Sequence, residues 1–445
     1  MNLESLKSHR VKMIFQFSIP SIIAMVLTSL ITVVDGLFIG NYVGGDGIAA
    51  VNLGLPIIYL YLGIGLMISV GGVALAGMAF GAGDIDKCNH VFNQTVCTTV
   101  VASALLTFVM WVCLDPMLQR LNANPQVATH FKNYYSVMLF QLPIMIINAS
   151  FGMFIRSEGE PAYFMKVNIL NVLLNTLLDF IFVKWLYQGV TGVAVASLIS
   201  GVVSLLCILY YFIKKSKVYK LGKFRYSSTV WKSTVFNGSS EFIGEMSLCI
   251  SIFAYNFVIL KYIGVHGVTA FAIAGYISYI FSMIILGFGQ GVVPLLSFSY
   301  GAKEYSLASN IRKTTNMIVL IVGAAVLLLV LLSSGWYSQL FVRDEQIKQM
   351  IRSGLVIFSV SFLFSGVNTI TSFYFTSIGK AKESAMISSA RGLFFLLICI
   401  FTLPSILGMN GVWLVAPVTE GITLLITFFY IYKEKVKERE GGFAL

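Results

Sequence analysis

The chain has 445 residues, of which 57% are hydrophobic and only 11% are charged, and its mean hydropathy is +0.86. Soluble domains carry about 25% charged residues, so this composition excludes a water-soluble domain, a disordered chain and a secreted disulfide scaffold. The net charge of +11 is typical of a nucleic-acid-binding protein, but the basic residues gather in the loops on one side of long apolar runs. The sequence therefore predicts a polytopic membrane protein with no nucleic-acid partner.

Long, continuous apolar runs predict membrane-spanning helices, which need about 20 mostly apolar residues each. A barrel strand would instead show short segments of alternating hydrophobicity. The runs number twelve and cover residues 13–40, 52–76, 91–113, 134–155, 163–184, 190–213, 235–260, 270–294, 314–334, 354–375, 386–404 and 411–432. We therefore expect an all-α membrane protein with 12 transmembrane helices.

The positions of lysine and arginine predict the orientation of these spans, because cytoplasmic loops are enriched in both residues. Most basic residues lie in the N-terminal tail, the even-numbered loops and the C-terminal tail. The loop between the sixth and seventh spans is the strongest signal, with Lys214, Lys215, Lys217, Lys220, Lys223, Arg225 and Lys232 and no acidic residue. Both termini are expected to be cytoplasmic.

The two halves of the chain resemble each other when one is shifted by 220 residues. This register pairs residues 41–95 with 261–315 without a gap. The matched residues include Gly, Tyr and Asn, which a shared apolar composition does not explain. Identical pairs are Tyr42 with Tyr262, Gly44 with Gly264, Gly81 with Gly301, Asn148 with Asn368 and Gly159 with Gly379. The pattern indicates an internal duplication.

Each repeat holds six predicted spans. Because six is even, both copies enter the membrane in the same direction and form a parallel repeat. We expect a six-helix lobe at residues 1–213, a basic cytoplasmic linker at 214–234, a second six-helix lobe at 235–433 and a cytoplasmic tail at 434–445. Transporters commonly have this plan, with the substrate site between the lobes.

Four oxygen-bearing side chains lie at similar depth in the first lobe. Asp35 is in the first span, Asn175 and Asp179 share one face of the fifth span, and Ser197 is in the sixth. Ionisable groups inside the membrane are costly and usually functional. Carboxylates with neutral oxygens suit a small hard cation such as Na⁺, and the same pair could hold a proton because burial disfavours two adjacent negative charges. A simple interhelical hydrogen bond is the alternative.

Acidic and aromatic residues elsewhere suggest a site for organic cations. Glu241 and Glu245 lie one turn apart at the start of the seventh span, facing either the cavity or solvent at the helix start. Aromatic rings and methionines bind bulky cations through cation–π contacts and adaptable packing. The candidates that could face the cavity are Tyr59, Met67, Tyr276, Tyr279 and Met283, and packing in the core or against lipid is the alternative for each.

Motifs for nucleotide hydrolysis or enzyme catalysis do not occur in the sequence. It lacks GxxxxGK[ST], HExxH and GxSxG. We therefore expect no enzyme activity, no ATP and no cofactor, and an ion gradient of H⁺ or Na⁺ as the energy source.

Several motifs together resemble the MATE (multidrug and toxic compound extrusion) family, closest to its bacterial multidrug subgroup. They are Val34 to Gly40, the turn from Arg156 to Pro161, Asn175 to Asp179, Gly192 to Ser197, and the paired turns at Gly81 and Gly301. The resemblance covers essentially the whole chain. It implies a V-shaped molecule that exports organic cations by alternating access, in exchange for H⁺ or Na⁺, as a monomer in the inner membrane of a bacterium.

The resemblance also implies a coupling-ion site, which maps onto Asp35, Asn175, Asp179 and Ser197, where Ser197 replaces the commoner Thr and keeps the hydroxyl. A flippase for lipid-linked saccharides or other lipids is the alternative, since it shares the two-lobe architecture. Its anionic cargo would require basic residues in the cavity, whereas the predicted spans carry mainly acids.

Overall fold

The computed structural model describes residues 3–121, 124–222 and 224–439 and is almost entirely helical in these ranges. Lys223 of the predicted linker and residues 440–445 of the predicted tail lie outside them. The first half contains α1 (Leu3–Ser8), α2 (Arg10–Tyr42), α3 (Gly45–Leu53), α4 (Leu55–Gly81), α5 (Ile85–Leu121), α6 (Pro125–Glu158), α7 (Pro161–Asp179), the π-helical segment η1 (Phe180–Trp185) and α8 (Gly189–Lys214).

The second half contains α9 (Ser228–Asn237), α10 (Ser239–Tyr262), α11 (Val265–Gly301), α12 (Tyr305–Phe341), α13 (Glu345–Ser359), α14 (Phe362–Ser377), α15 (Ala381–Ser389), the π-helical segment η2 (Ala390–Phe394) and α16 (Phe395–Arg439). It covers the repeat-related positions with helices that are broken at different points, so that α11 corresponds to α3 and α4, and α13 with α14 corresponds to α6. Helix α9 begins inside the segment that the sequence predicts as a linker and ends three residues beyond it, and it packs on α4 and α5. The domain boundaries stay predictions.

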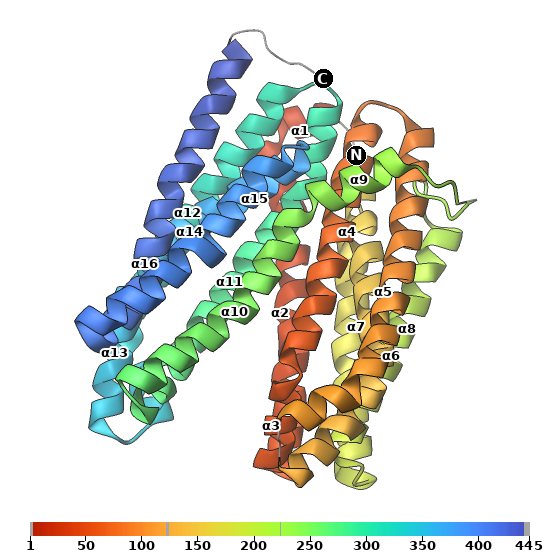
Figure 1. Ribbon diagram of the computed structural model, residues 1–445. Helices are drawn as coiled ribbons and strands as arrows, with labels where there is room; N and C mark the ends of the chain where they lie inside the picture. Colours follow the sequence, from red (N-terminus) through yellow and green to blue (C-terminus); the bar gives the residue numbers. More distant parts are fainter. Residues whose placement is uncertain (1–2, 122–123, 223, 440–445) are drawn as a thin grey trace.

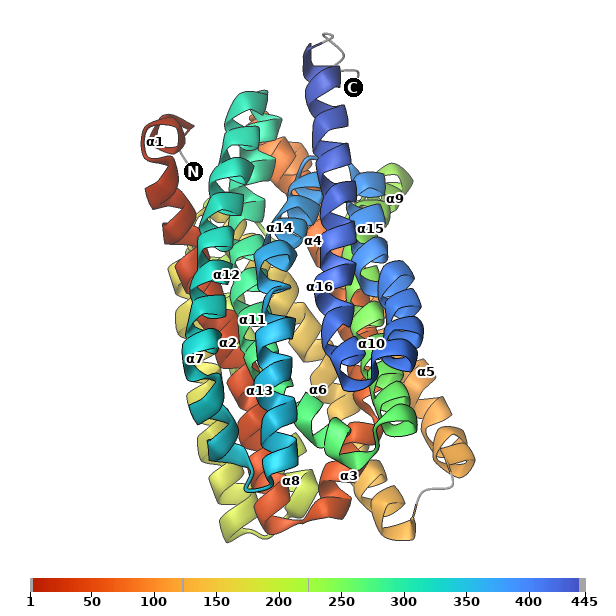
Figure 2. The same cartoon turned by 90° about the vertical axis from the view of Figure 1, so that its left-hand side faces the viewer.

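The helices account for the twelve predicted spans. Ten described helical stretches are long and apolar enough to cross a membrane, and α13 with α14, bent by 45° at a short break, makes an eleventh. The stretch Ala381–Val436 is 56 residues long. It is broken at Gly408, whose φ of 57° and ψ of −135° are not helical. The chain turns back there (Figure 2), so this stretch contains the last two spans.

The turns of the two halves have matching backbone conformations. A positive φ is easy for glycine and costly for residues with a Cβ. The positive-φ pairs are Gly44 (96°) with Gly264 (90°), Gly83 (78°) with Lys303 (62°), Gly159 (109°) with Gly379 (78°), and Gly189 (58°) with Gly408 (57°). These turns explain why glycines recur at the same register, and they confirm the internal repeat.

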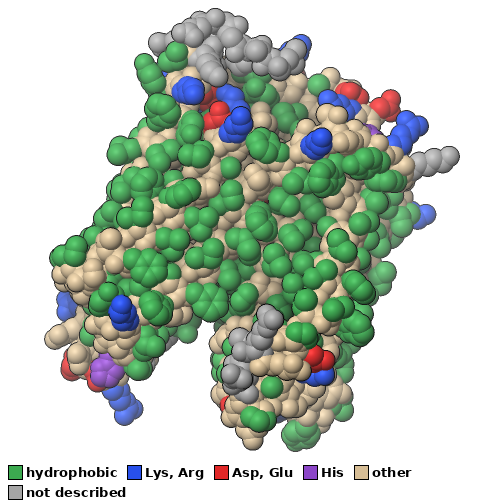
Figure 3. Space-filling view, in the orientation of Figure 1, with side chains coloured by type: hydrophobic (Ala, Val, Ile, Leu, Met, Phe, Trp, Pro, Cys, Tyr) green, Lys and Arg blue, Asp and Glu red, His purple; other side chains and the backbone are tan. Residues whose placement is uncertain are grey.

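The two halves form two lobes arranged as a V (Figure 1). Helices α2 to α8 make one lobe and α10 to α16 the other, here called the N-lobe and the C-lobe. The lobes meet at the end of the molecule that carries α1 and α9, here called the terminal end, and diverge toward the opposite end. A cleft opens between them there, while hydrophobic side chains cover the middle of the molecule (Figure 3). Such an apolar belt suits a lipid bilayer.

Glycines bring the backbones of the two lobes together at the terminal end. A Cβ added to Gly81 of α4 would lie 2.0 Å from the carbonyl oxygen of Phe298 in α11, and a Cβ added to Gly301 would lie 2.0 Å from that of Met78 in α4. The repeat relates these two contacts to each other. Only glycine fits at either position, so the lobes make a tight, symmetric seam that closes this end of the cleft.

Candidate functional site

Three helices of the N-lobe bring the predicted ion-binding residues together. Asn175 and Asp179 are fully buried in α7, one turn apart, and face Asp35 of α2 and Ser197 of α8. The Asn175 Nδ2 donates to Ser197 Oγ at 3.1 Å, and Ser197 Oγ donates to Asp35 Oδ2 at 3.3 Å. The carboxyls of Asp35 and Asp179 lie within interaction range of each other. Two acids, an amide and a hydroxyl thus line one small space.

This acidic cluster contains more buried acceptors than donors. Both carboxyl oxygens of Asp179, Oδ1 of Asp35 and Oδ1 of Asn175 are buried and have no hydrogen-bond partner. The ion pairs among the described residues do not involve either carboxyl. Buried carboxylates are costly unless they are paired, protonated or bound to a cation. The cluster therefore has the chemistry to take up a proton or a small cation such as Na⁺.

Two features beside the cluster were not predicted from the sequence. Tyr134 of α6 is buried within electrostatic range of both Asp35 and Asp179. The π-helical segment η1 begins directly after Asp179, and such segments often occur at functional sites because they interrupt the regular helix. No local sequence pattern marks either feature, since Tyr134 reaches the cluster only through the packing of α6.

A second group of candidates lies where the two lobes face each other. Glu245 of α10 is within electrostatic range of Tyr59 in α4 and Tyr279 in α11, so residues of both lobes surround it. The α4 backbone is close as well, since a Cβ added to Gly63 would lie 3.5 Å from the Glu245 Cβ. Glu241 interacts with Glu245 one turn away. The arrangement offers negative charge and aromatic rings to a cation between the lobes.

The remaining cavity candidates are dispersed. Tyr276 of α11 interacts with Tyr337 of α12 within the C-lobe. Met67 lies at the seam, where its carbonyl oxygen faces the Gly238 backbone, because a Cβ added to Gly238 would be 1.8 Å from that oxygen. Met283 is half-buried on α11, one turn after Tyr279. Their predicted contact with cargo stays a prediction.

The C-lobe contains a half-buried ion pair that was not predicted from the sequence. Arg391 of η2 donates from Nη2 to Glu420 Oε1 at 2.6 Å and from Nε to the same oxygen at 3.1 Å. Asn368 Nδ2 donates to Glu420 Oε2 at 2.7 Å. The C-lobe interior therefore holds a basic residue as well as acids. The two partners are 29 residues apart in sequence, and only the fold brings them together.

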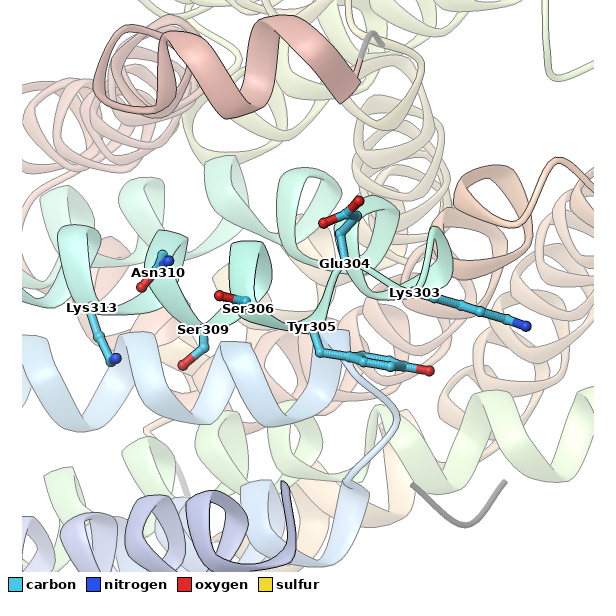
Figure 4. A pocket seen from close by; sticks show the side chains of 7 residues that line it. All are labelled: Lys303, Glu304, Tyr305, Ser306, Ser309, Asn310 and Lys313. Atoms are coloured by element: carbon cyan, nitrogen blue, oxygen red, sulfur yellow. The ribbon is translucent and has the colours of Figure 1, made fainter. Parts of the chain in front are cut away.

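A shallow pocket of about 410 Å³ lies at the start of α12, away from both groups of candidates (Figure 4). Glu304 at its edge points toward α1, and its Oε1 forms an ion pair with Lys7 Nζ at 2.6 Å. A second cavity, of about 560 Å³, lies between α2 and the turn at Glu158. Neither is lined by the candidate residues, so the chemistry lies in the acidic cluster and the cleft instead.

Glu158 of the predicted turn motif holds the start of the linker. Its carboxylate accepts hydrogen bonds from Tyr211 Oη at 2.9 Å and from the backbone amide of Val218 at 2.6 Å, and also from the amide of Lys217. Ser157 bonds the buried Tyr219 hydroxyl at 2.8 Å. Outside the membrane-spanning helices, burial raises the pKa of Tyr219 well above its usual value, which keeps the phenol neutral.

The chain resembles curated transport proteins over nearly its whole length. It is 22% identical over 423 residues to "Multidrug export protein MepA" of Staphylococcus haemolyticus, covering 95% of this chain and 93% of that protein. It is also 22% identical over 428 residues to the protein of the same name from Staphylococcus saprophyticus, covering 96% of this chain and 94% of the relative.

Solved structures of similar fold agree with the two-lobe architecture. One is described as an outward-facing conformation of a multidrug resistance MATE family transporter of the MOP superfamily, with a TM-score of 0.91, 23% identity and coverage of 96% of both chains. Another, a MATE protein in the bent conformation, has a TM-score of 0.91 at 23% identity and covers 98% of both chains.

The family comparison matches both halves of the chain separately. The MatE family model aligns with residues 20–181 and again with residues 242–401. These two segments lie in the two lobes at positions that the internal repeat relates, and together they span well over half of the sequence. The protein therefore belongs to the MatE family, as its motifs predict.

Proposed function

We propose that this protein is a secondary active antiporter that exports organic cations in exchange for H⁺ or Na⁺ by alternating access. The observation that carries the proposal is the pair of buried carboxyls, Asp35 and Asp179, which have unmet acceptors and no basic partner among the described ion pairs. The names of the relatives, multidrug export proteins, support the same function. The comparisons do not favour the lipid flippase.

Helix α2 is the element that would couple the ion to the cleft. It carries Asp35, and it packs on α7 in its own lobe and on α11 of the other lobe. The second contact is close, because a Cβ added to Gly287 of α11 would lie 2.5 Å from the Ile22 Cα. Pro20 interrupts the hydrogen bonding of α2 near this contact. A change in charge at Asp35 would therefore bias the packing between the lobes.

The exchange of cargo for the coupling ion then follows from the change in charge of the Asp35–Asp179 pair. A proton or Na⁺ entering from the open side neutralises the Asp35–Asp179 pair, which favours a repacked α2 and release of the cargo. Loss of that ion on the other side restores the negative charge and allows cargo to bind again. A coupling free energy of about 1–3 kcal/mol between the two sites is enough for this cycle.

The cargo site would be the group around Glu245. A carboxylate beside Tyr59 and Tyr279 suits a flat or bulky organic cation, through charge and through cation–π contacts. The lobes are closed at the terminal end, which the basic loops predict to be cytoplasmic, and the cleft opens at the opposite end. This arrangement corresponds to the outward-open state, from which cargo leaves.

Purified protein in liposomes tests the proposal, with ethidium as the cargo and a pH gradient or a Na⁺ gradient imposed separately. We expect one gradient to drive ethidium movement in the wild type and Asp35→Asn to abolish it. A matched control is Asp115→Asn, whose carboxylate is exposed and pairs with Lys132 at 2.9 Å. The coupling assignment is refuted by wild-type rates in Asp35→Asn, and the antiporter itself by ethidium movement that neither gradient drives.

A further inference from the structure

The start of α5 holds the chain that leaves the N-lobe. Asn89 Oδ1 accepts a hydrogen bond from the backbone amide of Lys220 at 2.7 Å. Asn93 Oδ1 accepts from the backbone amide of Gly222 at 2.9 Å, and its Nδ2 donates to the carbonyl oxygen of Lys220 at 2.9 Å. These bonds run from side chains of α5 to the main chain of the predicted linker. The linker therefore docks on α5 through groups that any sequence carries.

The pocket at the start of α12 lies at the repeat-related position of this docking face. At the shift of 220 residues, Asn89 corresponds to Ser309 and Asn93 to Lys313. Ser309 and Lys313 both line the pocket, one turn apart on one face of α12. Figure 4 shows their side chains pointing to the same side of the helix, and Lys303 pointing away from them. The C-lobe thus has a groove where the N-lobe binds its linker.

This groove offers a positive charge and free polar groups. Lys313 takes part in no ion pair among the described residues, whereas the groove acid Glu304 is paired with Lys7. Three further polar side chains line the groove and make no side-chain hydrogen bond within the described ranges, namely Ser306, Ser309 and Asn310. The groove therefore suits a segment that brings a carboxylate and main-chain hydrogen-bonding groups.

Helix α16 passes close to the groove before the described chain ends. Glu434 of α16 accepts a hydrogen bond from Tyr374 Oη at 3.0 Å. The guanidinium of Arg312 lies 5.1 Å from the centre of the same tyrosine ring, and Arg312 directly precedes the groove residue Lys313. Tyr374 therefore links α16 to α12 at the level of the groove.

The tail at residues 440–445 follows α16 as the linker follows α8, and it is long enough to return to the groove. From Glu434 to Arg439 the helix rises about 7–8 Å, whereas six extended residues span about 20 Å. The tail reads Glu-Gly-Gly-Phe-Ala-Leu. Its carboxylate at Glu440 matches the unpaired lysine of the groove, and its two glycines allow the main chain to approach a helix closely.

We propose that residues 440–445 dock in the groove at the start of α12, as the linker docks on α5. The main chain of the tail bonds to polar side chains of the groove, and Glu440 pairs with Lys313. The docked tail ties the end of the last span to α12, beside the Lys7–Glu304 pair that joins α1 to the C-lobe. It thereby strengthens the closed end of the cleft, whatever cargo the cleft carries.

A photoreactive side chain in the tail tests this docking. The variant Phe443→benzoylphenylalanine of the full-length protein is irradiated in lipid nanodiscs, and the cross-linked peptides are identified by mass spectrometry. We expect the main product to join the tail to residues 303–313 of the same molecule. Lys313→Glu should lower its yield about fivefold, the size expected for one partly exposed ion pair. Adding Glu440→Lys, which restores the pair with the charges exchanged, should recover the yield.

Two controls separate docking from a general effect of charge or of folding. Lys382→Glu reverses an exposed lysine of α15 that does not line the groove, and it should leave the yield unchanged. Deletion of residues 440–445 should lower the melting temperature. In the deleted chain, Lys313→Glu should lower it no further, because the partner of the lysine is already absent.

The products distinguish the tail from other occupants of the groove. Cross-links of Phe443→benzoylphenylalanine to lipid alone, or between two copies of the chain, would overturn the proposal. The first result would leave the groove to a phospholipid headgroup and the second to a dimer interface. An unchanged yield in a folded Lys313→Glu variant, or a yield that Glu440→Lys fails to recover, would contradict the pairing of Glu440 with Lys313.

Discussion

The two lobes have the same backbone fold but differ in whether their membrane-embedded carboxyl groups have a counter-charge. In the N-lobe, Asn148 Nδ2 donates to the carbonyl oxygen of Gly201 at 3.0 Å, and in the C-lobe the repeat-related Asn368 donates to that of Glu420 at the same distance. Around this shared bond the N-lobe leaves Asp35 and Asp179 without counter-charges, whereas the C-lobe gives Glu420 an arginine.

The difference separates what the fold requires from what the function requires. A stable membrane helix bundle needs its buried charges to be paired, and Glu420 of the C-lobe meets this requirement through Arg391. The N-lobe does not, and the C-lobe residues at the repeat positions of Asp35 and Asp179 are Tyr255 and Cys399, so the acids are not needed for the architecture. An uncompensated pair that the fold does not need is what the proposed exchange of H⁺ or Na⁺ would use.

Neutralising Asp179, the fully buried acid of the N-lobe, should have the largest effect on transport. Asp179→Asn removes a charge without a partner, so we expect gradient-driven ethidium movement to fall about 100-fold, as for a lost coupling of roughly 3 kcal/mol. The same change should raise the melting temperature, because an amide costs less to bury than a carboxylate. A lower melting temperature together with normal transport would mean that Asp179 serves the structure, as Glu420 does.

Breaking the C-lobe pair on one side should have the opposite effect on stability. Glu420→Gln leaves Arg391 without its counter-charge, and we expect a loss of about 2–3 kcal/mol, somewhat below the roughly 3–5 of a fully buried pair, because the arginine side chain is 27% exposed. The double variant with Arg391→Gln should recover most of this loss. Thermal unfolding of the singles and the double gives the coupling energy, and additive losses would mean that the pair is not coupled.

Substituting the seam glycine of either lobe should slow export to the same extent. Gly81→Ala and Gly301→Ala each place a methyl group 2.0 Å from a carbonyl oxygen of the other lobe. Each should push the closed end apart and slow export by about tenfold, for a shift of roughly 1.4 kcal/mol between states. Distances between spin labels on the two lobes would report the opening. Gly45→Ala, with nothing within 4 Å of the added Cβ, is the matched control, and unequal effects of the two seam variants would contradict a symmetric seam.

The architecture could be predicted from the sequence because membrane spans and internal repeats produce patterns that are visible along the chain. Apolar length, basic loops and paired glycines predicted the spans and the two lobes. The grouping of Asp35, Asn175, Asp179 and Ser197 could be predicted because their depth follows from position along each span. Arg391 with Glu420 could not be found in this way, since the pairing depends on how η2 is rotated against α16. Tyr134 was missed for the same reason.

The turn at Lys303 is the smallest difference between the lobes and the easiest to reverse. Lys303 adopts a φ of 62° where its counterpart Gly83 has 78°. A side chain in this region costs about 1–2 kcal/mol, and glycine loses about 0.4–1 kcal/mol more chain entropy on folding. Since the Lys303 side chain is exposed (Figure 4), Lys303→Gly should stabilise the protein by about 0.5–1 kcal/mol in thermal unfolding. Gly83→Ala, which adds the side-chain cost, should destabilise it. A loss of stability in Lys303→Gly would mean that the lysine makes contacts that outweigh the cost of its backbone, and the two turns would then differ in more than their geometry.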